Sequence, residues 1–341
     1  MDDRGLRLAM VGEIRRHVSF DAYVWVLTDP RSWVGSAPLA DVPCLPELLT
    51  LIRLKYGTAL NRWTVLPGLA AEGRQLAATL HATTEGHLER SLVWRDLLSG
   101  YGVVDVASLA FVDHFGCWAF LDLWRSGGPP FDEGERVTLA TLVEPLATAL
   151  RECQMRALAT GTARRMVGPA VLLLGDDLQV LSQTDATRSV LDALNPPGNG
   201  QVAIPAAAYN VAAQLRAVEA GVDGHDPSAR VHLGDGLWLT LSAARIHQSE
   251  GAARNDIAVA IETTSADDRL DLHSRCFGLT PREGQLLRLI ASGADTRTVS
   301  RILLLSEYTV QDHLKSVFAK TGVRSRSALL AQVRGPVAMA T

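Results

Sequence analysis

Residues 276–335 carry helix-capping signals at a spacing that leaves room only for short helices joined by tight links. A Ser or Thr side chain before a helix can accept a hydrogen bond from its first free amides, and a glycine after it tolerates the left-handed backbone that ends a helix. Proline suits the first helical position, and a glutamate two residues later completes a capping box. The signals in this segment are Thr280-Pro281, Glu283, Gly293, Ser306, Gly322 and Ser325. They predict a helix-turn-helix unit of minimal size, with helices over 280–292, around 299–303, over 306–321 and over 325–333.

The third of these helices separates its residues by face. Apolar residues at i, i+4, i+7 and i+8 form a stripe for the core. A polar row lies on the opposite side and would face the edges of DNA bases in a major groove, where Gln can read adenine, Lys can reach guanine and Asp can accept from cytosine. The core stripe is Val310, Leu314, Val317 and Phe318, and the base-facing row is Tyr308, Gln311, Asp312 and Lys315.

Charge is segregated onto the same segment. The chain has 341 residues with 33 Lys and Arg against 37 Asp and Glu, so a protein that is basic throughout is excluded. Residues 276–334 hold nine basic and four acidic residues, a net charge of +5 that leaves −9 on the rest of the chain. Such a local excess suits a phosphate backbone. The residues predicted to contact phosphates are Thr309, His313, Ser316, Lys320, Arg297, Arg301, Arg324 and Arg326.

These residues resemble the LuxR-type helix-turn-helix over about 276–335. The resemblance rests on LTPRE at 279–283, Gly293, TV at 309–310, HLK at 313–315 and TGVRSR at 321–326. It implies that the helix from Glu307 is the recognition helix. It also implies a dimer seam on the fourth helix through Leu329, Leu330 and Val333, although packing of these residues onto their own domain is an equal alternative.

Two positions depart from the family pattern. Leu304 stands where the family usually has a glycine in the turn, so the turn either holds a strained left-handed leucine or is reshaped. Gln311-Asp312 follows Thr309-Val310 where the family often has a lysine, which removes one charge that attracts phosphate and adds one that repels it. The operator sequence of the family therefore cannot be transferred to this chain.

The region before residue 276 is predicted to contain two mixed α/β modules. An amphipathic helix over 1–19 precedes a strand at 22–28, helices near 45–55 and 76–99, a hairpin of strands 103–112 and 117–124, and a capped helix over 131–150. This pattern over 20–152 resembles a GAF sensory domain. A helical linker over 153–166 leads to strands and short helices over 167–265 that resemble a PAS domain, and residues 266–275 are expected to be a linker.

Most enzyme classes lack their defining residues in this sequence. The chain has only three lysines, Lys55, Lys315 and Lys320, and none follows a glycine, so a P-loop is excluded. Motifs of hydrolases, zincins, kinases and Rossmann folds are missing too, and LLLGDD at 172–177 lacks the later Asp and Lys of a phospho-receiver. We therefore predict a protein that is not an enzyme and needs no cofactor or metal.

The strand at 117–124 supplies the candidate ligand pocket. Every second residue there is aromatic or acidic on one face of the sheet, namely Trp118, Phe120, Asp122 and Trp124. A sheet covered by helices on both sides explains the same pattern. An acyl-homoserine-lactone receptor is an alternative suggested by Trp25, Asp29-Pro30 and Trp33, but the chain has room for two sensory modules.

Together these features predict a one-component transcription regulator of multidomain α+β fold. Its partners would be double-stranded DNA, a second copy of the chain, a small-molecule effector and RNA polymerase. With no apolar run of membrane length, no secretory signal and four scattered cysteines, we expect it in the cytoplasm and not at a membrane. The alternative from another class is a protein-interaction adaptor that binds no operator.

Overall fold

The computed structural model describes residues 2–71, 77–159, 168–194, 206–233, 237–246 and 256–335. The chain forms two compact units. The first comprises Met1–Leu150, Met166–Val231 and Leu239–Glu262, and the second comprises Arg151–Arg165, His232–Trp238 and Thr263–Thr341. The prediction of a mixed α/β protein with a helical C-terminal domain is confirmed. Within the described ranges, no helix is both long and apolar enough to cross a bilayer.

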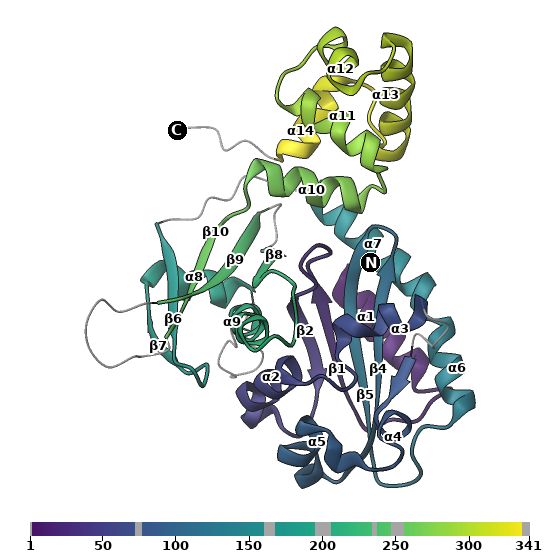
Figure 1. Cartoon of the computed structure of the whole chain (residues 1–341), viewed down its shortest axis with the longest axis vertical. Helices are drawn as coiled ribbons and strands as arrows, with labels where there is room; N and C mark the ends of the chain where they lie inside the picture. Colours follow the sequence, from purple (N-terminus) through teal and green to yellow (C-terminus); the bar gives the residue numbers. More distant parts are fainter. Residues whose placement is uncertain are drawn as a thin grey trace. The chain divides into compact units, whose positions relative to one another are not determined.

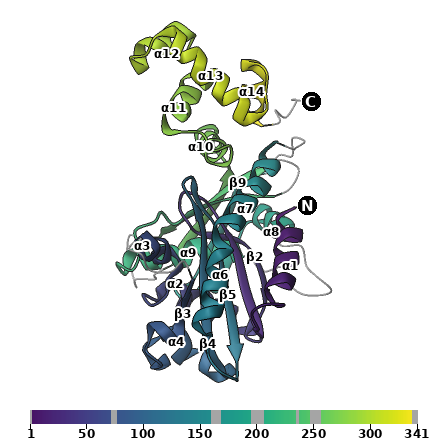
Figure 2. The same ribbon diagram turned by 90° about the vertical axis from the view of Figure 1, so that its right-hand side faces the viewer.

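The first module is built on sheet A, whose strand order is β2-β1-β5-β4-β3. Figures 1 and 2 show helices on both sides of this sheet. Its strands are β1 (Ala22–Thr28), β2 (Gly35–Asp41), β3 (Ala77–Thr79), β4 (Val103–Asp113) and β5 (Gly116–Ser126). The strand predicted over 22–28 and the hairpin predicted from strands 103–112 and 117–124 are confirmed.

Among the described residues, seven α-helices accompany sheet A: α1 precedes its first strand, α2 to α5 connect its strands, and α6 and α7 follow its last strand. Their bounds are α1 (Asp3–Ile14), α2 (Leu48–Gly57), α3 (Leu66–Ala71), α4 (Leu80–Thr83), α5 (Leu92–Asp96), α6 (Glu133–Thr141) and α7 (Val143–Ala159). The predicted capping box at the start of α6 is confirmed: Asp132 accepts from the Glu135 amide and Glu135 accepts from the Asp132 amide. Arg125 on β5 binds the Glu135 carboxylate at 2.7 Å, which ties this helix to the sheet.

Two parts of the first module differ from the sequence prediction. The helix expected over 76–99 is wrong, because this stretch holds the edge strand β3 followed by the short helices α4 and α5. Strand β2 was not predicted, since its residues GSAPLAD carry little of the β-branched and aromatic signal of a strand. Both are edge strands, where backbone pairing with one neighbour outweighs local propensity.

The second module is built on sheet B, which repeats the strand order of sheet A. Its order is β7-β6-β10-β9-β8, so that the first strand of each module lies between the second and the fifth. The strands are β6 (Ala170–Leu174), β7 (Val180–Gln183), β8 (Ser228–His232), β9 (Trp238–Arg245) and β10 (Ile257–Thr263), and the helices are α8 (Asp185–Leu194) and α9 (Ala206–Glu219). The strands and short helices predicted over 167–265 are confirmed.

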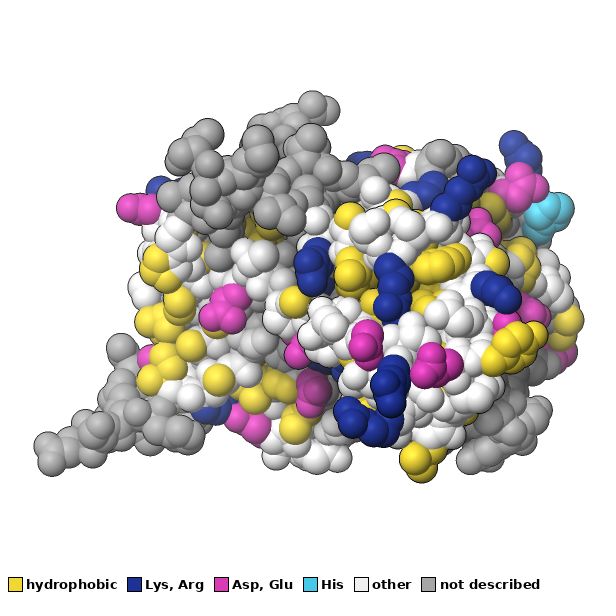
Figure 3. All heavy atoms as spheres, turned by 90° about the horizontal axis from the view of Figure 1, so that it is seen from above, with side chains coloured by type: hydrophobic (Ala, Val, Ile, Leu, Met, Phe, Trp, Pro, Cys, Tyr) yellow, Lys and Arg dark blue, Asp and Glu magenta, His cyan; other side chains and the backbone are white. Residues whose placement is uncertain are grey.

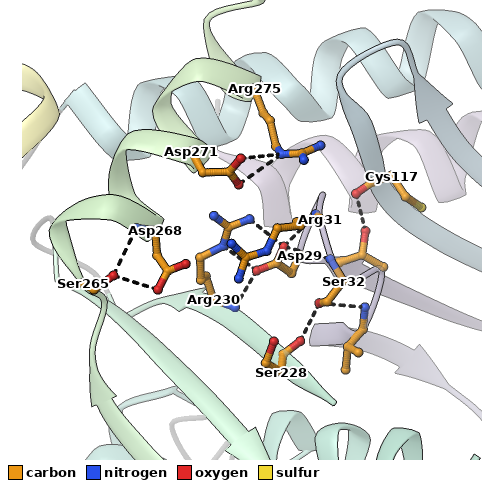
Figure 4. Close-up of polar contacts among 12 residues, drawn as sticks. Asp29, Arg31, Ser32, Cys117, Ser228, Arg230, Ser265, Asp268, Asp271 and Arg275 are labelled. Carbon is orange, nitrogen blue, oxygen red and sulfur yellow. Dashed lines mark hydrogen bonds and ion pairs between the residues drawn. The ribbon is translucent and has the colours of Figure 1, made fainter. Parts of the chain in front are cut away.

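A buried ion pair links the two modules within the first unit. Asp29, at the end of β1, binds Arg230 on β8 through two guanidinium nitrogens at 2.6 and 2.8 Å (Figure 4). The side chains are 4% and 1% exposed. Burial alone would raise the pKa of Asp29, but Arg230 and the neighbouring amides outweigh it and hold the pKa below its ordinary value. The carboxylate is thus ionised where two β-sheets meet.

A second set of contacts lies along α9. Arg62 binds Asp223 at 2.6 Å, with both side chains 4% exposed, and also donates to Gln214 of α9. Trp33 stacks on His225 with ring centroids 4.9 Å apart. Helix α9 packs on α2 and β2. Helix α9 therefore lies within the second module in the sequence but packs against the first module.

The C-terminal part of the second unit, from Thr263 on, is a bundle of short helices. They are α10 (Ala266–Cys276), α11 (Pro281–Ala291), α12 (Thr296–Leu303), α13 (Glu307–Thr321) and α14 (Arg326–Arg334). We expected residues 266–275 to be a linker. They instead form α10, with Ser265 as its N-cap. Buried Leu270 and Leu272 give this charged helix an apolar side that the polar residues around it concealed in the sequence.

Removal of one partner from the buried Asp29–Arg230 pair should destabilise the first unit. We expect Asp29→Ala to lower the free energy of unfolding by about 3 to 5 kcal/mol, since it removes the carboxylate that the buried guanidinium binds through two nitrogens. Urea unfolding followed by tryptophan fluorescence measures this, because six of the seven tryptophans lie in the first unit and residues 266–335 contain none. The double variant Asp29→Ala/Arg230→Met should recover much of the loss, and a single-variant cost below about 1 kcal/mol would contradict the assignment.

Candidate nucleic-acid interface

Helix α13 is held at both ends by the predicted caps. The Ser306 hydroxyl accepts from the Thr309 amide at 3.0 Å, and Gly322 ends the helix with a φ of 71°. The predicted apolar stripe packs against α11 and α12: Val310, Leu314 and Val317 are no more than 3% exposed. One face of the helix is thus fixed in the core, and the opposite face is left at the surface.

A buried carboxylate joins α11 to α13. Glu283 accepts from Lys320 at 2.6 Å, from Ser316 at 2.7 Å and from the Thr280 amide at 2.7 Å, and its side chain is 4% exposed. Burial would raise the pKa of Glu283, but these hydrogen bonds and the Lys320 charge outweigh it and lower the pKa to about 2. The capping glutamate of α11 thereby also sets the position of α13.

The turn before α13 contains the strained leucine considered from the sequence. Leu304 lies in the left-handed region at φ 53° and ψ 46°, and its side chain is 90% exposed. The turn is therefore not reshaped to relieve the leucine. The Ser300 carbonyl accepts from the Leu305 amide at 3.0 Å, and Arg282 donates to the Leu303 carbonyl, so hydrogen bonds on both sides of Leu304 maintain this geometry.

The predicted base-facing residues all lie at the surface of α13. Tyr308 is 75% exposed, and Gln311, Asp312 and Lys315 are exposed beside it. Lys315 pairs with Asp312 at 3.1 Å, and Gln311 donates to the Thr296 hydroxyl of α12 at 3.3 Å. Figure 3 shows Lys and Arg side chains dispersed among polar and acidic groups on this end of the chain. The row presents donors and acceptors together, as base-edge readout requires.

The residues predicted to contact phosphates occupy two different environments. Arg297, Arg301 and Arg324 are exposed, and Thr309 and His313 are half-buried. Ser316 and Lys320 are bonded to Glu283, so a contact with phosphate would compete with that bond. Two guanidinium nitrogens of Arg326, Nε and Nη2, are buried.

Helix α14 turns its apolar residues toward its own domain. Leu329 and Val333 are 0% and 3% exposed, and Leu330 packs at the edge of the α11–α13 core. The helix lies against α10, where the Val333 carbonyl accepts from Arg269 at 2.9 Å. The sequence left open whether these residues form a dimer seam or pack onto their own domain. Their side chains pack onto their own domain.

The predicted ligand-lining residues of β5 are all buried in sheet A. Asp122 and Trp124 line two adjoining cavities. Phe120 stacks on Trp63 at 5.0 Å, and Trp63 lines the larger cavity. Trp118 lines neither of them. Lys55, Asn61 and Trp63, which the sequence analysis did not link to this site, approach Asp122 and Trp124 from outside the sheet, and only the tertiary fold brings them there.

Comparison with known proteins assigns the C-terminal helices. Residues 278–332 match the family model described as bacterial regulatory proteins, luxR family. These residues form a LuxR-family helix-turn-helix domain. Over 82 residues the chain is 38% identical to the probable HTH-type transcriptional regulator GfsR of Streptomyces halstedii, covering 24% of this chain and 34% of that protein. Over 63 residues it is 35% identical to the monoamine regulon transcriptional regulator of Klebsiella aerogenes, covering 18% of this chain and 28% of that one. The chain thus spans about a third or less of these two relatives, and both are named as regulators.

Solved LuxR-type proteins show only a weak likeness to this chain. A Vibrio cholera VqmA–ligand–DNA complex is 17% identical with a TM-score of 0.22, over 49% of this chain and 82% of that one. SdiA in complex with octanoyl-rac-glycerol is 14% identical with a TM-score of 0.28, over 98% and 96%. These scores are too low to assign the modules that precede the LuxR-family domain.

The Glu283 cluster should make the LuxR-family domain sensitive to acid. Its pKa of about 2 in the folded state is below the ordinary 4.5, so its stabilising contribution is present above pH 4.5 and is lost as the pH falls toward 2. The shift corresponds to about 3 kcal/mol. We expect Glu283→Gln to lower stability at pH 7 and to flatten this pH dependence, measured by urea unfolding with far-ultraviolet circular dichroism. The exposed Glu307→Gln of α13 is the matched control, and equal behaviour of the two variants would exclude a special role for Glu283.

Relief of the left-handed leucine should stabilise the same domain. Leu304→Gly removes a backbone cost of about 1 to 2 kcal/mol but adds unfolded-state entropy, so we expect a net gain of about 1 kcal/mol. Hydrogen exchange of the α12 and α13 amides should slow accordingly. Leu304→Ala keeps the Cβ atom and should bring no such gain, so similar exchange in both variants would be evidence against strain at this turn.

Proposed function

We propose that this chain is a one-component transcription regulator, in which GAF-like and PAS-like modules control a dimeric LuxR-family domain that binds an operator. The observation that carries the proposal is the exposed polar row of α13, since its helix belongs to a domain of matched family and its opposite face is fixed in the core. Because packing fixes the position of this row, its side chains can contact base edges in a defined arrangement.

Sequence readout would come from Gln311, Asp312 and Lys315, with Tyr308 at the start of the helix. The Lys315–Asp312 pair has side chains that are 74% and 46% exposed, so exchanging it for a base contact costs less than about 1 kcal/mol. Gln311 would likewise exchange its long hydrogen bond to Thr296 for a base. Asp312 repels phosphate, so we expect it to act through an amino group of a base such as cytosine.

Phosphate contacts would orient the domain on the duplex. Arg297, Arg301 and Arg324 are exposed on α12 and before α14, and Thr309 and His313 flank the row on α13. Ser316 and Lys320 can contribute only if they leave Glu283, so we assign them mainly to stability. Arg326 would contribute only through its remaining nitrogen.

A dimer would give two recognition helices and a two-fold symmetric operator. Since Leu329 and Val333 are buried in their own domain, a seam on α14 would use its exposed positions, which include Ala328 and Ala331. RNA polymerase is the expected partner at a promoter, and the cytoplasm is the expected compartment.

The shared strand order of sheets A and B supports the assignment of two related sensory modules. Their buried ion pairs, Asp29–Arg230 and Arg62–Asp223, would let a change in one module reach the other. A small-molecule effector is the expected input.

Lys315→Ala should weaken selection of an operator. Purified full-length protein would be used to select genomic DNA fragments, and affinity for the enriched site would be measured over a range of salt. A DNA-binding parent should show a log–log salt slope of about −0.9 per phosphate contacted, and the variant should lose about tenfold in affinity for the site. Arg288→Ala on α11 removes an equal charge from an exposed helix outside the predicted row and should keep the site preference.

Two outcomes would contradict this assignment. If Lys315→Ala selects the same fragments at equal affinity, α13 is not the recognition helix. If the folded parent protein shows no salt-dependent DNA binding, either alone or after a small-molecule extract of cells is added, the adaptor alternative is favoured instead.

A further inference from the structure

Two adjoining cavities lie against sheet A of the first module. The centre of a water molecule can reach about 60 Å³ of the larger cavity and about 30 Å³ of the smaller. Both are lined by Leu51, Lys55, Asp122 and Trp124, so these residues form their common boundary. One water molecule needs roughly 10 to 15 Å³ on this measure, so both cavities have room for more than one small group.

The charged groups at this boundary already neutralise each other. Lys55 binds the Asp122 carboxylate at 2.8 Å, with side chains 11% and 6% exposed. Trp63 and Ser108 donate to the other oxygen of Asp122 at 2.7 and 2.6 Å. The Lys55 ammonium also lies 4.5 Å from the Trp63 ring centroid. A charged ligand would therefore enter an apolar space without a free counter-charge, which is costly.

Two buried donors at the cavities have no acceptor. Trp124 is 1% exposed and lines both cavities, yet its indole Nε1 has no hydrogen-bond partner among the described residues. Asn61 is 9% exposed and lines the smaller cavity; its Oδ1 accepts from Thr83 at 2.8 Å, while its Nδ2 has no partner within the same described part of the chain. A buried donor left unpaired costs about 1 to 3 kcal/mol, so each of these groups favours an acceptor in the cavity.

We propose that these cavities bind one uncharged, mainly apolar molecule through a carbonyl-type oxygen that accepts from Trp124 Nε1, with Asn61 Nδ2 as the second donor. The Lys55–Asp122 pair orients Trp63 and Ser108 around the same site and does not bind the ligand as an ion. The apolar part of the molecule would occupy the larger cavity, which is lined by valines, leucines and alanines of β1, β2 and α2.

Helix α9 of the second module closes the larger cavity. Ala206 and Asn210 contribute to its lining, and Asn210 donates to the Gly35 carbonyl at 3.0 Å. The Gly35 amide in turn donates to the Tyr56 hydroxyl at 3.0 Å, and a Cβ atom on Gly35 would lie 2.5 Å from Val26. A ligand in the cavity therefore contacts both modules and would stabilise α9 against the first.

The test measures binding of three eight-carbon probes to the full chain in the absence of DNA. These are 2-octanone, which carries an acceptor and no charge, octanoate, which is an anion, and octylammonium, which is a cation. We expect calorimetric binding of the ketone in preference to both ions. Trp124→Phe should weaken ketone binding about threefold to tenfold. Trp118→Phe is the matched control, because it makes the same change on the same strand at a buried indole that also lacks a partner and lines neither cavity.

The hydrogen exchange of α9 provides a second readout. Saturating ketone should slow exchange over 206–219 in the parent and in Trp118→Phe, and less in Trp124→Phe. Equal weakening in the two tryptophan variants, preference for either ion, or no ketone binding by folded protein would overturn the proposal, and unchanged exchange in α9 would overturn the part that concerns its cover. This inference rests on the sensory part of the proposed function, but its readouts use no DNA, so its failure is distinct from a failure of operator selection.

Discussion

The arrangement of the LuxR-family domain depends on one buried carboxylate. Glu283 begins as a capping residue of α11, and a local sequence pattern is enough to explain it there. The same side chain also holds Lys320 and Ser316 of α13. Because one group satisfies an amide, a hydroxyl and an ammonium, the helix with the polar row has little freedom to rotate relative to α11. The polar row can therefore be read as a surface whose geometry is set before any DNA is bound.

The caps and faces of the C-terminal helices could be predicted because each is encoded within a few residues. The boundaries of α11, α13 and α14 follow from Thr280, Ser306 and Ser325, and the strand β1 follows from a compact run of Val, Trp and Tyr. Strands β2 and β3 escaped prediction because they are edge strands of weak propensity, stabilised by pairing with β1 and β4. Helix α10 escaped because its charged residues conceal the apolar ones that contact the bundle.

Some residues of the candidate ligand site could likewise be predicted from the sequence, and others could not. Alternation along β5 indicated Asp122 and Trp124, because the two faces of a strand can be read from the sequence. Lys55, Asn61 and Trp63 could not be found by periodicity, since they come from α2 and the segment after it and meet β5 only through the fold. The residue across the sheet from Asp122 follows from strand register: Ser108 pairs with it and donates to its carboxylate.

The cover provided by α9 has a consequence for dissecting the chain. A fragment that ends after α7 would retain sheet A, but Asp29 and Arg62 would lose their ion-pair partners, and the apolar cavity beside Gly35 would open to water. A fragment that begins at β6 would expose the other halves of the same contacts. The two sheets are therefore expected to fold and to be purified only as one fragment, even though each repeats the topology of a self-contained module.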